Sequence, residues 1–217
     1  MAATNYTSII AAQDAFLNAA ARQGITPSTS ISAQQLPMSV LANVLQGQAG
    51  GAALNTGAAA GITSGTGAIA RSSVTTEGGL IITRLFVDMT GLQSSTTDLD
   101  IIGTGASPAF LARITSAESG TIIGGTITCL EAPATGVTTI DWYAATEGTG
   151  VFDGAVTSLT ETVIHTASGA STLGLVVPIQ PDAIAANDYI YIVNGAAGTV
   201  GTYTAGRFLL TLFGVIV

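Results

Sequence analysis

The chain has 217 residues, of which 47% are hydrophobic and only 8% are charged, and its formal net charge is −8. Average soluble domains carry about 25% charged residues, so this composition predicts a packed core under a surface of small uncharged side chains that is suited to protein interfaces. Five arginines give no basic footprint, which argues against nucleic acid as a partner. No apolar run reaches about 18 residues and no basic residue precedes Arg22, so neither a membrane span nor a secretory signal is expected.

Two short amphipathic helices are predicted in an N-terminal arm, residues 1–47. Apolar side chains recur at helical spacing over residues 5–23, before Gly24, and over residues 37–46, before Gly47. Helices this short are marginal in isolation, so their apolar stripes predict that the arm docks on protein. The residues expected to make these contacts are Tyr6, Ile9, Ile10, Phe16, Leu17, Val40, Leu41, Val44 and Leu45.

Residues 48–71 are rich in glycine and alanine, with threonine and serine among them. Such a composition is typical of a flexible linker. Small side chains also allow an extended backbone to lie closely along another subunit. The helices before this segment favour the extended arm, and the linker remains the alternative.

Residues 72–217 are predicted to form one mainly β domain. Runs rich in threonine, valine and isoleucine alternate there with Gly, Ser, Asp and Pro clusters. Short strands with regular turn signals predict an antiparallel β-sandwich or jelly roll. The expected strands are 80–89, 109–115, 120–130, 138–143, 156–165, 173–178, 189–193 and 207–217.

No catalytic residue, metal site or cofactor is predicted. His165 and Cys129 are the only histidine and cysteine, and they lie on different predicted strands, so a metal cluster is not expected and no intrachain disulfide can form. Asp98 and Asp100 lack the ordered spacing of a calcium loop, which favours a solvated turn. Trp142 and Tyr143 are adjacent on a strand and face opposite sides of it. Core or interface packing is therefore favoured over a sugar site.

Six blocks stand in order in the β region: TEGGLIIT (76–83), VDMTGL (87–92), DIIG (100–103), TCLEAP (128–133), TEGTG (146–150) and GTYTAGRF (201–208). Together they resemble a family of virion proteins from tailed phages of aquatic bacteria, cyanophages among them. The resemblance covers residues 72–217 and does not extend over residues 1–70. It implies a β-sandwich of the virion, made in the cytoplasm of the host bacterium, with no catalytic residues to transfer.

The most natural role that this resemblance implies is a head decoration (cement) protein, which binds the outer face of the capsid. Its expected partners are the major capsid protein and further copies of this chain, in a closed oligomer of two or three subunits with a trimer favoured. Another virion component, such as a tail fibre head, a tail-tube or a major capsid subunit, is the alternative. A carbohydrate-active or other enzyme and a cellular surface-layer protein are the remaining alternatives.

Overall fold

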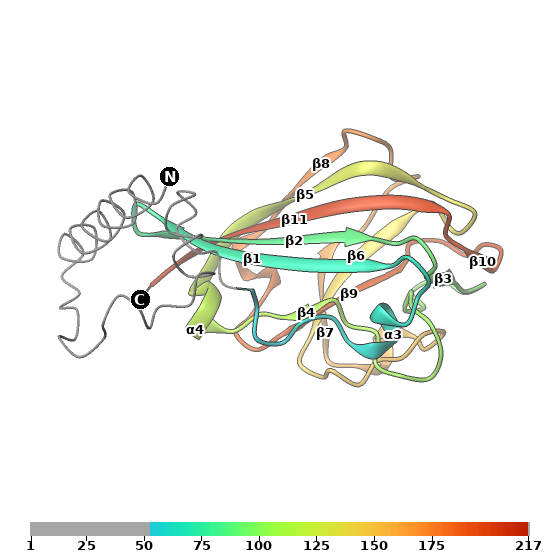
Figure 1. Cartoon of the computed structure of the whole chain (residues 1–217), viewed down its shortest axis with the longest axis horizontal. Helices are drawn as coiled ribbons and strands as arrows, with labels where there is room; N and C mark the ends of the chain where they lie inside the picture. The colour runs from blue at the N-terminus through green and yellow to red at the C-terminus, as the bar shows by residue number, and fades with distance from the viewer. Residues whose placement is uncertain (1–52, 217) are drawn as a thin grey trace, which may run out of the picture. The chain divides into compact units, whose positions relative to one another are not determined.

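The computed structural model describes residues 53–216, which form a mainly β domain with antiparallel sheets (Figure 1). The fold class predicted from the sequence is confirmed at this level. The strands are β1 (Ile69–Glu77), β2 (Leu80–Asp88), β3 (Gln93–Ser94), β4 (Ala112–Arg113), β5 (Thr121–Ala134), β6 (Ile140–Ala145), β7 (Glu161–His165), β8 (Val176–Ile179), β9 (Tyr189–Asn194), β10 (Gly201–Thr202) and β11 (Ala205–Val215). The helical turns are α3 (Ala60–Thr63), α4 (Ser116–Ser119), η2 (Val156–Ser158) and η3 (Pro181–Ala183). No helix in residues 53–216 is long and apolar enough to cross a membrane.

A five-stranded sheet has the order β1-β2-β11-β5-β8. The last strand of the chain, β11, lies inside it and pairs with both β2 and β5 (Figure 1). Alternate residues of β11 are buried, from Gly206 through Phe208, Leu210 and Leu212 to Gly214. A period of two in burial is typical of a strand with one face on the core. The sequence predicts a strand over 207–217 from its apolar run.

A four-stranded sheet has the order β4-β9-β6-β7, and β10 pairs separately with β3. All six residues of β6 are buried, so both faces of this strand are covered. On one face, Trp142 of β6 packs edge-on against Phe208 of β11, with ring centroids 5.8 Å apart. This contact joins the four-stranded sheet to the five-stranded sheet.

The second face of the β9–β6 pair is covered by long connections. Gly150 lies against the side chains of Ile101 and Tyr191, and Phe110 packs edge-on against Tyr189 at 4.8 Å. Tyr191 donates a hydrogen bond to the Glu147 carbonyl at 2.7 Å. These connections, rather than a third sheet, complete the core on this side.

The described part of the predicted linker, residues 53–71, packs on the β domain. Leu54 and Ile62 are buried, and the Gly61 amide donates to the Pro108 carbonyl at 2.7 Å. The Leu54 amide donates to Ser72 Oγ at 3.0 Å, and β1 begins at Ile69, three residues before the predicted start of the domain. Small side chains allow this close approach, as expected, but the surface that the segment lies along belongs to its own domain.

Candidate functional site

The protein-contact residues predicted in the arm all precede Ala53. They and both predicted helices lie outside the described residues.

His165 is partly buried on β7, near the charge of Asp141. Burial lowers the pKa of His165, and the nearby charge of Asp141 acts in the opposite direction. Burial raises the pKa of Asp141, whose carboxylate accepts the Ala167 amide at 2.7 Å. Within the described part of the chain, no hydrogen bond joins His165 to a serine or a carboxylate. Cys129 is buried, as expected of a structural thiol, and burial raises its pKa.

Asp98 and Asp100 differ in their surroundings. Asp98 is exposed, whereas Asp100 is buried and accepts a hydrogen bond from Ser95. Asn194 fixes the same turn by donating to the carbonyls of Ser95 and Thr97, each at 3.0 Å. The prediction of a solvated turn is thus correct for Asp98. It is wrong for Asp100, whose carboxylate is buried and holds the turn through its hydrogen bond with Ser95. Over residues 53–216 there is no cluster of three potential metal-ligating side chains.

Trp142 and Tyr143 both belong to the core. Their exposed fractions are 1% and 5%, because β6 is covered on both faces. Neither ring is available to stack on a sugar. Core packing, which the sequence favours for this pair, is confirmed.

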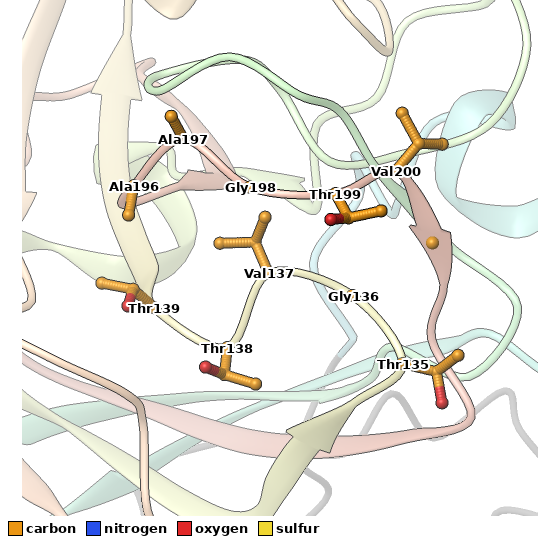
Figure 2. Close-up of a pocket in the computed structure, with 11 residues that line it drawn as sticks. Thr135, Gly136, Val137, Thr138, Thr139, Ala196, Ala197, Gly198, Thr199 and Val200 are labelled. Carbon is orange, nitrogen blue, oxygen red and sulfur yellow. The ribbon is translucent and has the colours of Figure 1, made fainter.

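A groove of about 510 Å³ lies between the β5–β6 and β9–β10 connections (Figure 2). Its floor is pinned by buried side chains: Ser94 Oγ accepts the amides of Val137 and Gly201 at 3.3 and 3.2 Å, and the Tyr203 hydroxyl donates to the Val137 carbonyl at 2.7 Å. The lining is formed by Thr, Gly, Ala and Val residues of segments 135–139 and 196–201. None of these side chains is ionisable. The groove therefore presents threonine hydroxyl groups and apolar surface to a ligand, but no general acid or base and no activated nucleophile.

An apolar surface patch lies where β5 meets the edge strand β8. The backbone pairs Thr128 with Val176, and the Cys129 amide donates to the Leu175 carbonyl at 2.8 Å. Four large apolar side chains are exposed along this edge of the sheet, and we call them the β8 patch: Leu130, Leu173, Leu175 and Val176. Pairing with Thr128 places Val176 on the same face of the sheet as Leu130, whereas Leu175, the residue before Val176, turns to the other side of the edge. The sequence contains a signal for this patch, because the run from Leu173 to Ile179 has no polar residue with which to alternate. The sequence predicts only a strand over residues 173–178 and no interaction surface there.

A charged cluster crosses the outer face of the five-stranded sheet at β2, β11 and β5. Arg207 Nε lies 2.9 Å from Asp88 Oδ2 and 3.5 Å from Glu131 Oε2. Burial alone would raise the pKa of Asp88, but hydrogen bonds from Thr90 and Arg207 outweigh it and hold that pKa below its ordinary value. The ionised carboxylate is therefore the form that suits the folded protein.

Replacement of Asp88 by asparagine is expected to lower the urea midpoint of unfolding at pH 7. Because the pKa of Asp88 is lower in the folded protein, its contribution is present above the unfolded pKa of about 3.9 and is lost as the pH falls through the folded value. The difference between wild type and D88N should therefore shrink between pH 5 and pH 2. Urea titrations at several pH values measure it, with the exposed Asp98→Asn as the matched control. A midpoint difference independent of pH would contradict the ionic role of Asp88.

No family model, no curated protein and no solved structure matches the chain.

Proposed function

We propose that the chain is a structural protein of a phage particle, a head decoration protein that binds the outer face of the capsid and stabilises it. The observation that carries this proposal is the β8 patch, an exposed apolar surface on a domain whose described residues hold no catalytic constellation. Large apolar side chains that cluster on a surface mark a site for another protein. The block resemblance to virion proteins of tailed phages supports the same role.

The composition of the surface supports an interface as well. Residues 53–216 contain no lysine and four arginines: Arg71, Arg84, Arg113 and Arg207. Threonine, serine, alanine and glycine, which form most of the loops, cost little to desolvate. Repeated contacts of modest affinity suffice on a symmetric lattice, because every copy that is held reinforces the next.

We include in this proposal the finer architecture that the sequence predicts, an antiparallel β-sandwich. Both sheets contribute buried residues to one core cluster, and the contact between Trp142 and Phe208 joins them. Sandwich domains are rigid and present their edges and loops to partners. The β8 patch stands at such an edge.

The experiment that tests the function is binding of the purified full chain to heads of the encoding phage that lack it. Wild type is expected to saturate the heads at hundreds of copies per particle, counted by quantitative mass spectrometry. Val176→Asp should weaken binding about tenfold or more, because a carboxylate would have to be desolvated within the apolar contact.

Val200→Asp is the matched control. Val200 is as exposed as Val176, at 57% against 56%, and lies at the groove (Figure 2). Binding of this variant should equal that of wild type. Loss of binding with V200D but not with V176D would move the interface from the β8 patch to the groove. Saturation at a few copies per particle would place the protein in the tail and contradict the decoration role.

A further inference from the structure

Among residues 53–216, β1 is the long edge strand of the five-stranded sheet and has no neighbour on its outer side. In the described part of the chain, β1 pairs with β2 alone, over nine residues and without a register shift. The opposite edge strand, β8, has four residues and contains Pro178, both of which limit further pairing. β1 contains neither proline nor lysine nor a bulge. Natural proteins usually protect an edge strand of this length from pairing with another chain. The lack of such protection on β1 indicates that a further strand pairs with it.

The β1–β2 turn determines which backbone groups of β1 face outward. Gly78 and Gly79 form a two-residue turn with φ of 59° and 88°, which is the type I′ hairpin. In such a hairpin the flanking residues, Glu77 and Leu80, form a hydrogen-bonded pair, and bonded pairs then alternate along the strands. Odd-numbered residues of β1 therefore bond to β2. The N–H and C=O groups of Ser72, Val74 and Thr76 point to the open edge.

One antiparallel register makes this edge complementary to itself. When Val74 faces Val74 of a second copy, Ser72 faces Thr76 and each outward amide meets an outward carbonyl. The same register places Arg71 opposite Glu77, twice by symmetry. Both side chains are exposed, lie on the same face of β1 and have no ion-pair partner in residues 53–216. Opposite charges at directly paired positions stabilise a strand pair, whereas like charges destabilise it.

We infer that two copies of this chain associate through β1, antiparallel and centred on Val74, so that their five-stranded sheets join into one continuous sheet. The contact has two-fold symmetry, and the same residues serve both copies. It refines the expected oligomer, for which the sequence favours a trimer, to a pair of chains at this edge. The inference stands without the proposed function, since no residue of the β8 patch takes part in it.

Charge exchange tests the register on the full chain. By analytical ultracentrifugation over a range of concentrations, wild type is expected to dimerise, and Glu77→Arg or Arg71→Glu to dimerise about tenfold more weakly or worse. The double variant R71E/E77R should regain the affinity of wild type, because each new charge again faces its opposite. Glu161→Arg, on the edge strand β7 of the other sheet, is the matched control and should dimerise as wild type does.

A disulfide test locates the two-fold axis. Two Cα atoms in a hydrogen-bonded antiparallel pair are about 5.5 Å apart, within reach of a disulfide. Oxidised Val74→Cys should therefore form a covalent dimer. Thr76→Cys should not, because the two cysteines would lie about 13 Å apart along the strands. Wild type, which keeps buried Cys129, is the background.

Three outcomes would overturn the inference: a wild-type monomer at all concentrations, an oligomer that both single charge variants leave unchanged, or a double variant as weak as the single ones. Circular dichroism of each variant establishes that it is folded. Because these experiments need no phage heads, their failure would not affect the proposed decoration role. A failure of head binding would likewise leave the dimer in place.

Discussion

Trp142→Ala is expected to lower the free energy of unfolding by about 3 to 5 kcal/mol, the largest loss from a single side chain in this domain. Trp142 is 1% exposed and is the largest of the fully buried side chains. It lies on β6 and contacts Phe208 of β11. Its removal leaves a cavity between strands of different sheets, where neither backbone can move in without breaking its own ladder. Urea unfolding followed by far-UV circular dichroism measures the change.

Two further variants separate the contact between the sheets from the loss of volume. Trp142→Phe keeps an aromatic ring at this position and should cost clearly less than alanine. The double variant W142A/F208A should cost about 0.5 to 1.5 kcal/mol less than the sum of the single variants, since an edge-on aromatic pair can be lost only once. Strict additivity would show that the rings do not interact, and the case for a two-layer sandwich would then rest on the shared core alone.

The sequence predicts strands well where one face of the strand meets the core. The expected strand 207–217 corresponds to β11, whose apolar run, interrupted by Thr211 and Gly214, is visible in the letters, although only alternate residues of it are buried. Strands are predicted less well where other parts of the chain cover both faces of the strand, or where the strand makes only a few backbone hydrogen bonds to its neighbour. The expected strand 109–115 is reduced to Ala112–Arg113, and the expected strand 156–165 divides into η2 and β7.

The sequence does not predict β1 as a separate strand, for a physical reason. Its sequence, IARSSVTTE, lacks a regular apolar face, because an edge strand of mixed burial needs none. Its place is set by the glycine pair at 78–79 and by the ladder to β2. The pairing of β11 with β2 and β5 joins strands far apart in sequence, and no local pattern encodes it.

The candidate surfaces depend on long-range pairing in the same way. Leu173, Leu175 and Val176 form a patch with Leu130 only because β8 lies against β5. Arg71 and Glu77 become complementary across two copies only once the hairpin register is known. The predicted arm contacts lie outside the described residues, so they remain a prediction from the sequence.

Gly91→Ala is expected to lower the free energy of unfolding by about 3 kcal/mol or more, and it tests whether the segment before β1 belongs to the folded domain. Gly91 has φ of 86°, which costs a side-chain-bearing residue about 1 to 2 kcal/mol. A Cβ there would also meet the Thr66 backbone, with the carbonyl oxygen only 2.1 Å away. Overpacking against backbone adds about 1 to 3 kcal/mol.

Gly105→Ala is the matched control for Gly91→Ala, because it isolates the backbone cost. Its φ is 63°, but nothing lies within 4 Å of the added Cβ. The loss for G105A should therefore stay near 1 to 2 kcal/mol. The excess for G91A measures how firmly residues 64–66 are held against the turn that follows β2. Equal losses for the two variants would mean that this segment moves aside without cost. Residues 53–68 would then be a linker, as composition alone suggests, and not part of the β domain.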